Sequence, residues 1–269
     1  MSIRLIATDL DGTLLDERKT IPEENLQALE RCAEKGVHIV FASGRSYANI
    51  RLLAKKLSCP VGIVSLNGGR ADESAFGPNV YRRYVDGDTA LRMWKLMRET
   101  GEYFICYAGE KVYVGNPQPY PGHNHAPGKR GEDGVFQEYT TDEAEFLQEG
   151  FMHAEKFVFY CMKADVLSRM REEILKLPVN LFSSAGDNLE ALPRDADKGQ
   201  GVLELAKRLH VRPCEIAAFG DYDNDETMLA AAGYPVAMAG GSDELKKPGR
   251  AVTDSVWKYL MKMLESGEI

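Results

Sequence analysis

Four short segments of the sequence carry residues suited to chemistry on a phosphate ester. A carboxylate can attack phosphorus only where a metal ion and fixed hydrogen-bond donors offset the repulsion between two anions. Mg²⁺ suits such a site because it takes one or two carboxylates, several waters and a phosphate oxygen. The segments with this combination are Asp9-Leu10-Asp11-Gly12-Thr13, Ser43-Gly44-Arg45, Lys198-Gly199 and Gly220-Asp221-Tyr222-Asp223-Asn224-Asp225.

The types and spacing of these residues predict a division of labour. Asp9 and Asp221 suit the carboxylate ligands of Mg²⁺, and the main-chain carbonyl of Asp11 suits a third ligand position. The Asp11 side chain can point in a different direction from that of Asp9. We therefore expect it to protonate the leaving oxygen and later to accept a proton from the attacking water. We expect the Ser43 hydroxyl and the Lys198 ammonium to hold the phosphate oxygens.

Each segment alone has an ordinary structural explanation. An Asp-x-Asp pair after a strand is usually a solvated turn, and Lys198 at the start of a helix would normally be a surface residue. Asp225 suits the first turn of a helix, where an anion is favourable. Arg45 suits a local ion pair. The occurrence of all four segments at ends of predicted elements, with complementary chemistry, favours a single site.

The surrounding pattern predicts an α/β fold. Continuous apolar runs indicate buried parallel strands, and helical spacing of apolar residues separates them. Ligands bind at the carboxyl ends of such strands, which is where three of the four segments lie. The predicted strands are 3–8, 37–42, 61–66, 215–219 and 235–238, and the predicted helices are 22–36, 47–57, 198–209, 224–232 and 256–264.

The middle of the chain has a different pattern. Its predicted helices (88–100, 141–149 and 165–177) are grouped with short strands (103–107, 111–114, 156–162 and 179–183) around a Pro-, Gly- and Asn-rich loop at 116–134. We therefore predict a core domain of residues 1–81 and 186–269 and an inserted α+β domain of residues 82–185. We expect the inserted domain to select the substrate. His123 and His125 are interpreted as exposed loop residues outside the site.

Composition excludes several classes of function. The 269 residues carry a formal net charge of −8, which argues against a nucleic-acid surface but not against a small phosphorylated partner. The sequence lacks both a transmembrane-length apolar run and a signal segment, so we expect a cytoplasmic protein without a membrane partner. Five scattered cysteines indicate neither a disulfide framework nor a zinc site. We expect a monomer or a weak homo-oligomer.

Taken together, the four segments resemble the motifs of the haloacid dehalogenase-like (HAD) hydrolase superfamily. The insertion of about a hundred residues resembles the cap of subclass IIB, the Cof-type sugar phosphatases. The resemblance covers essentially the whole chain. It implies a Rossmann-like parallel-sheet core, a mobile α/β cap, a Mg²⁺ cofactor, and a phosphatase acting on a sugar phosphate or similar metabolite.

Family roles carry over to matching positions of this sequence. The resemblance implies Asp9 as the nucleophile, Asp11 as the acid and base, and four phosphate-binding positions. It also implies that Asp9, the Asp11 carbonyl and Asp221 bind Mg²⁺, with Asp225 supporting the metal waters or Lys198. The implied phosphate-binding residues are Ser43, Gly44, Lys198 and Asn224.

Two segments depart from the family pattern, residues 237–241 and the C-terminal segment Thr253-Asp254-Ser255-Val256, which lacks the family's usual Asp-Gly-Val. Where the family often has Ala-Met-Gly-Asn-Ala, this chain has residues 237–241, Ala-Met-Ala-Gly-Gly, which lack the asparagine usually found near the phosphate. Two other functions remain open. The first alternative is a mutase-type phosphoryl transfer, which needs a long-lived aspartyl-phosphate. Asp11 disfavours it, because a base that activates water shortens the life of that intermediate. The second alternative is a phospho-aspartate sensor. Known receiver domains of the sensor type are about half this length.

Overall fold

The computed structural model describes residues 2–118, 120–121, 127–132, 135–183 and 186–269. The chain forms two compact units, unit 1 (Met1–Arg82 with Asp197–Ile269) and unit 2 (Arg83–Ala196). The predicted insertion 82–185 therefore begins one residue before unit 2 and ends before it does. The reason is strand β12 (Asn188–Pro193), which pairs with β10 (Ala154–Tyr160) and β11 (Val179–Phe182) and so belongs to unit 2.

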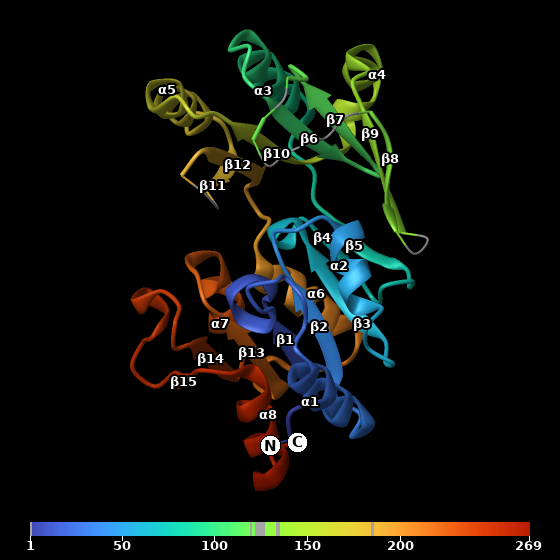
Figure 1. Ribbon diagram of the computed structural model, residues 1–269, viewed down its shortest axis with the longest axis vertical. Coiled ribbons are helices and arrows are strands. Elements are labelled where there is room, and N and C mark those ends of the chain that lie inside the picture. The colour runs from blue at the N-terminus through green and yellow to red at the C-terminus, as the bar shows by residue number, and fades with distance from the viewer. Residues whose placement is uncertain (1, 119, 122–126, 133–134, 184–185) are drawn as a thin grey trace. The chain divides into compact units, whose positions relative to one another are not determined.

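Unit 1 is built on an eight-stranded sheet (Figure 1), in the order β15-β14-β13-β1-β2-β3-β4-β5. The six strands from β15 to β3 are parallel, which confirms the predicted Rossmann-like parallel-sheet core. Strands β4 and β5 extend the sheet in antiparallel pairing and were not predicted. The strands are β1 (Leu5–Thr8), β2 (His38–Ala42), β3 (Val61–Ser65), β4 (Arg70–Asp72), β5 (Asn79–Arg82), β13 (Ile216–Gly220), β14 (Tyr234–Met238) and β15 (Ala251–Thr253).

Helices cover both faces of this sheet. Because side chains alternate along a strand, Ile6 faces the apolar cluster that includes α1 and α8, whereas Leu5 and Ala7 face the cluster that includes α6 and α7. This explains why the central parallel strands are almost continuously apolar. Figure 1 shows α1 and α8 side by side. The helices are α1 (Glu23–Glu34), α2 (Tyr47–Ala54), α6 (Lys198–Arg208), α7 (Glu226–Ala231) and α8 (Val256–Ser266).

Unit 2 is the predicted α+β insertion. Its sheet has the order β11-β12-β10-β6-β7-β9-β8, antiparallel except where β7 pairs with β9. Helices α3, α4 and α5 share one buried cluster with this sheet. Strand β8 lies inside the stretch predicted as loop 116–134, so that prediction was wrong for these residues. Glycine is depleted in strands, and the Gly-rich composition therefore indicated a loop. The remaining elements are α3 (Gly87–Glu99), α4 (Glu143–Gln148), α5 (Ala164–Ile174), β6 (Phe104–Ala108), β7 (Lys111–Gly115), β8 (Gly128–Glu132) and β9 (Val135–Thr140).

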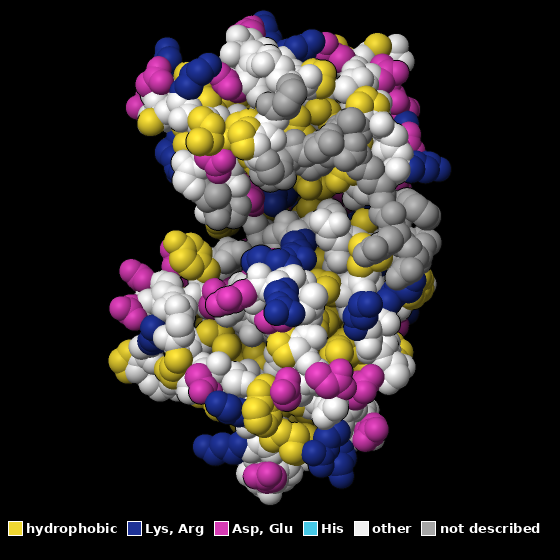
Figure 2. Space-filling view, in the orientation of Figure 1, with side chains coloured by type: hydrophobic (Ala, Val, Ile, Leu, Met, Phe, Trp, Pro, Cys, Tyr) yellow, Lys and Arg dark blue, Asp and Glu magenta, His cyan; other side chains and the backbone are white. Residues whose placement is uncertain are grey.

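The visible face of unit 1 (Figure 2) carries charges of both signs, and the cysteines form no disulfide. On the face of unit 1 shown in Figure 2, Lys and Arg side chains are interspersed with Asp and Glu side chains. All five cysteines are free thiols. Within the described residues, no helix has the length and apolar character needed to cross a bilayer. His123 and His125 lie outside the described residues.

Candidate active site

Two neighbouring strands and one helix bring together three of the predicted site residues, Asp9, Asp221 and Lys198. Asp9 directly follows β1 and Asp221 directly follows β13, and these strands pair in parallel with Thr8 opposite Phe219. Lys198 is the first residue of α6, whose N-terminus is capped by the Asp197 side chain accepting from the Gln200 N–H at 2.8 Å. Residues nearly 190 positions apart in the chain therefore meet at one edge of the sheet.

Lys198 lies between two buried carboxylates. Its Nζ donates to Asp9 Oδ1 and to Asp225 Oδ1, each at 2.6 Å, and all three side chains are buried. Burial alone would lower the pKa of Lys198, but Asp225 and Asp9 outweigh it and raise that pKa. Burial raises the pKa of Asp9 although Lys198 opposes it, and the negative charges of Asp225 and Asp221 add to the rise. The cluster therefore has an excess of negative charge.

Three carboxylates of this cluster offer a set of oxygen ligands. One oxygen each from Asp9, Asp221 and Asp225 lies within 4.8 Å of the others. Asp221 Oδ1 accepts a hydrogen bond from Thr13 Oγ1 at 3.1 Å, and burial together with Asp225 raises the pKa of Asp221. Hard oxygen donors with uncompensated negative charge are the chemistry that Mg²⁺ binds. The residues present therefore fit this ion.

Asp225 is the most fully engaged of the three carboxylates. Besides its contact with Lys198, its Oδ2 accepts from the main-chain N–H groups of Asp221 at 2.9 Å and of Tyr222 at 3.2 Å. These bonds fix the loop that follows β13. Of the two roles expected for Asp225, the contact with Lys198 is the one seen directly in its hydrogen bonds.

In the Leu10–Leu14 turn, the Asp11 side chain contacts Arg45 and Lys19, whereas Asp9 contacts Lys198. The carboxylate accepts from Arg45 Nε and Nη2, both at 2.7 Å, and from Lys19 Nζ at 2.8 Å. Burial opposes ionisation of Asp11, but these hydrogen bonds outweigh it and lower its pKa to about 2. Asp11 is therefore held in its ionised form, and these ion pairs make it a weaker base than a free carboxylate. The local ion pair expected for Arg45 is made with this residue.

Gly12 allows the turn after β1 to approach Asp221 closely. Its φ of +86° lies in the left-handed region, and a Cβ at this position would lie 2.1 Å from Asp221 Oδ2. Only glycine allows the turn after β1 and the loop after β13 to come this close. The Asp-x-Asp-Gly spacing therefore has a geometric cause.

The other predicted phosphate-binding residues, Ser43, Gly44 and Asn224, follow the ends of strands β2 and β13. Ser43 is buried directly after β2, where its Oγ accepts from the Arg45 N–H at 3.3 Å, and Gly44 follows it. Asn224 Nδ2 donates to Asn67 Oδ1 at 3.1 Å. Sequence reasoning missed Asn67, although it follows β3 at a strand end, which is the criterion that found the other segments.

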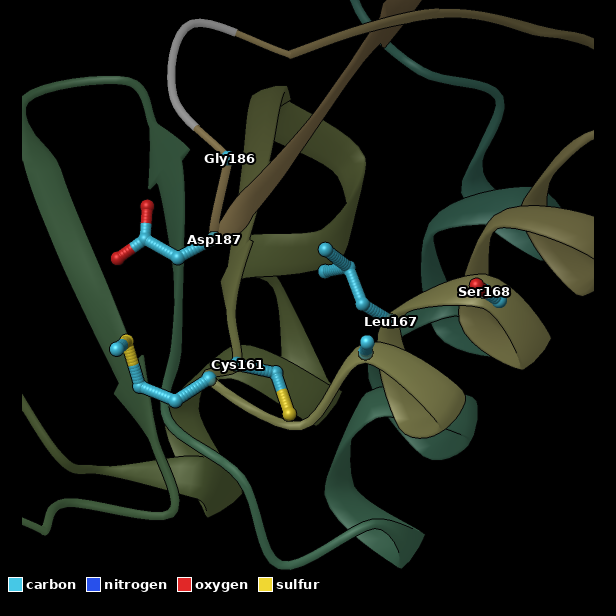
Figure 3. Close-up of a pocket in the computed structure, with 7 residues that line it drawn as sticks. Cys161, Leu167, Ser168, Gly186 and Asp187 are labelled. Atoms are coloured by element: carbon cyan, nitrogen blue, oxygen red, sulfur yellow. The ribbon is translucent and has the colours of Figure 1, made fainter.

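A separate hollow lies on unit 2 (Figure 3). It has a volume of about 430 Å³ and contains none of the predicted site residues. Two of its polar groups have partners: Asp187 Oδ2 accepts from the Tyr120 hydroxyl at 2.8 Å, and Cys161 Sγ accepts from the Lys163 N–H at 3.4 Å.

Comparison with known proteins identifies proteins of similar length. The chain is 28% identical over 256 residues to the 5-amino-6-(5-phospho-D-ribitylamino)uracil phosphatase YcsE of Bacillus subtilis, covering 95% of this chain and 91% of that protein. It is 27% identical over 278 residues to the phosphatase YwpJ of Bacillus subtilis, covering 93% and 94%.

Solved structures share the fold. A haloacid dehalogenase-like hydrolase from Bacteroides thetaiotaomicron superposes with a TM-score of 0.80 at 24% identity, covering 97% of this chain and all of that one. A second from Bacillus subtilis gives a TM-score of 0.79 at 23% identity, covering 98% and 99%. The sequence pattern of the haloacid dehalogenase-like hydrolases matches residues 6–258, which include every residue of the cluster around Asp9, and the chain therefore belongs to this family.

Proposed function

We propose that this protein is a Mg²⁺-dependent phosphatase that hydrolyses a small phosphate monoester through a phosphoryl group carried on Asp9. The observation that carries the proposal is the buried contact of Lys198 Nζ with Asp9 and Asp225. An anionic nucleophile can approach an anionic phosphate only where positive charge offsets their repulsion. The buried Lys198 supplies one such charge, and the acidic ligands beside it can bind a metal ion that supplies more. The phosphatases among the relatives support the reaction class.

Asp9, Asp221 and the Asp11 main-chain carbonyl would hold the metal ion. When bound, Mg²⁺ supplies positive charge that draws a phosphate oxygen to the cluster and offsets the charge of the attacking carboxylate. Thr13 keeps the Asp221 carboxylate oriented through its hydroxyl. Asp225 would keep Lys198 in place rather than act on the substrate.

Two half-reactions follow from this arrangement. In the first, an Asp9 oxygen forms a bond to phosphorus while the bond to the ester oxygen breaks, and Asp11 gives that oxygen a proton. In the second, water attacks the phosphoryl group on Asp9 while Asp11 takes the proton, releasing inorganic phosphate. The ion pairs that Asp11 makes with Arg45 and Lys19 favour its ionised form, so they must loosen before the first step.

The organic part of the substrate is proposed to be a phosphorylated sugar or similar metabolite. Support comes from YcsE, whose substrate carries a phosphorylated ribityl chain. Ser43, Gly44, Lys198 and Asn224 would hold the phosphate and offer no means of choosing its organic group. Selection is therefore assigned to unit 2.

A phosphate-release assay tests the proposal. The substrates are p-nitrophenyl phosphate and a panel of sugar and sugar-alcohol phosphates, each with Mg²⁺ and with EDTA. We expect turnover that requires Mg²⁺ and disappears in Asp9→Asn, which has the same shape without the charge. Acid quenching during turnover should trap one phosphoryl group on the peptide containing Asp9.

The matched control is Asp72→Asn. Asp72 is also a buried carboxylate of unit 1 and pairs with Arg70 Nε at 2.8 Å, but it lies outside the cluster. We expect this variant to lose stability and to keep its turnover per folded molecule. A wild-type rate no higher than that of Asp9→Asn across the panel would refute the proposed function.

A further inference from the structure

A loop with an unusual backbone connects the predicted phosphate-binding segments. Leu66, Asn67 and Gly68 follow β3 with φ values of 53°, 51° and 94°, all in the left-handed region. Leu66 and Asn67 are buried, so solvent does not explain this conformation. Asparagine tolerates it, but a leucine adopts it only where the surroundings impose it, and such residues concentrate at functional sites.

The loop is held by main-chain contacts to the segments on either side. The Asn67 N–H donates to the Ser43 carbonyl and the Leu66 N–H donates to the Arg45 carbonyl, each at 3.0 Å. On the other side, a Cβ on Gly68 would lie 1.9 Å from the Asp197 carbonyl oxygen, directly before Lys198. The loop therefore lies between the Ser43–Arg45 segment and the start of α6.

The Asn67 side chain reaches two more predicted phosphate-binding residues. Its Oδ1 accepts from Asn224 Nδ2 at 3.1 Å. A Cβ on Gly44 would lie 2.9 Å from the same Oδ1, so the amide rests against the bare main chain of that glycine. Asn67 is 4% exposed and Asn224 is partly buried, so water has only limited access to the bond between them.

We propose that Asn67 is a positioning residue of the phosphate subsite, which fixes the Asn224 side chain in the orientation that binds phosphate. The inference rests on the proposed function, since it assigns a role within that site. It makes a specific demand: removal of the Asn67 amide must weaken phosphate binding through Asn224 and not independently of it.

The test uses Asn67→Gly, Asn224→Ala and the double variant of the full chain. Glycine accepts the left-handed backbone, so the first change removes the side chain with its amide and leaves the backbone unstrained. Inorganic phosphate with Mg²⁺ is the probe, measured as a competitive inhibitor of p-nitrophenyl phosphate turnover. We expect Asn67→Gly to raise its inhibition constant about three- to tenfold, the effect of losing one buried hydrogen bond. In the double variant the constant should equal that of Asn224→Ala.

A second buried asparagine provides the matched control. Asn116 in unit 2 has a φ of 48° and is 5% exposed, and its Nδ2 donates to the Met97, Arg98 and Glu102 carbonyls. Asn116→Gly should lower the melting temperature without changing inhibition by phosphate. An unchanged inhibition constant in Asn67→Gly, or effects that multiply in the double variant, would overturn the inference.

A measurement on the unsubstituted chain does not depend on how the variants fold. The side-chain NH₂ signals of Asn67 and Asn224 should both shift when phosphate and Mg²⁺ are added to ¹⁵N-labelled protein, and the Asn116 signals should not. An Asn67 signal that stays in place while Asn224 shifts would also overturn the inference. Absence of turnover in the wild-type chain would instead refute the proposed function, so the two failures are distinguishable.

Discussion

Replacing Lys198 with methionine should destabilise unit 1 more than any ordinary surface change. Lys198 Nζ donates two charged hydrogen bonds of 2.6 Å to buried carboxylates, and methionine keeps most of the side-chain volume without the charge. Each such bond contributes about 1.5–3 kcal/mol, and breaking a buried pair from one side costs about 3–5 kcal/mol in free energy of unfolding. Asp9 can limit the loss by taking up a proton, because its pKa is already raised. We therefore expect about 3–5 kcal/mol.

The two tryptophans allow each unit to be followed separately. Trp257 lies in α8 of unit 1 and Trp94 in α3 of unit 2, so Trp94→Phe leaves a tryptophan in unit 1 alone. Urea unfolding of Lys198→Met in that background, with EDTA, gives the free energy of unfolding of unit 1. Added Mg²⁺ should recover part of the loss, because it supplies charge to Asp9 in place of the lysine.

A buried lysine of unit 2 serves as the control. Lys156 Nζ lies 2.6 Å from Glu190 Oε2, and both side chains are largely buried. Lys156→Met should destabilise unit 2, reported by Trp94 in a Trp257→Phe background, to the same extent with Mg²⁺ and with EDTA. The reasoning is refuted if Lys198→Met costs less than about 1 kcal/mol, the value of an exposed pair, or if Mg²⁺ rescues both lysine variants equally.

Three further changes have definite expected outcomes. Gly12→Ala should lower kcat about a hundredfold in the phosphate-release assay, because the added methyl group displaces the Asp221 carboxylate. EDTA should lower the melting temperature of unit 1, by an amount equivalent to about 2.7 kcal/mol relative to Mg²⁺ at a hundred times its Kd. Hydrogen bonds from Arg250 lower the pKa of Glu226 from 4.5 to about 2, so its contribution is complete above pH 4.5 and is lost as pH falls towards 2. Glu226→Gln should therefore cost about 0.5–1 kcal/mol at neutral pH and almost nothing near pH 2, measured by urea unfolding.

The sequence was informative where one local rule decides the outcome. Apolar runs located the long parallel strands, since a strand buried on both faces has few other compositions. It failed for β4, β5 and β15, where three or four residues with charged or exposed side chains are strands only because a neighbour pairs with them. The boundary of unit 2 was misplaced for the same reason, because β12 is defined by its partners in the sheet.

For the candidate site, the sequence predicted which residues lie there but not which side chains they contact. The positions of Asp9 and Asp221 at strand ends predicted that they are neighbours, because the carboxyl ends of parallel strands lie at one edge of the sheet. The partner of Asp11 could not be assigned from sequence, since Arg45 and Lys19 reach it through a turn whose path depends on Gly12. Partner choice requires side-chain direction, which spacing along the chain does not contain.

Lys198 illustrates how a residue typical of the surface becomes buried. Its position at the start of a helix would normally expose it, but a Cβ on the next residue, Gly199, would lie 2.4 Å from the Thr227 carbonyl oxygen of α7. The start of α6 can approach α7 this closely only because residue 199 has no side chain, and this approach brings Lys198 Nζ to Asp225. Gly199 therefore determines where the charge of Lys198 is placed, although Gly199 itself carries no functional group.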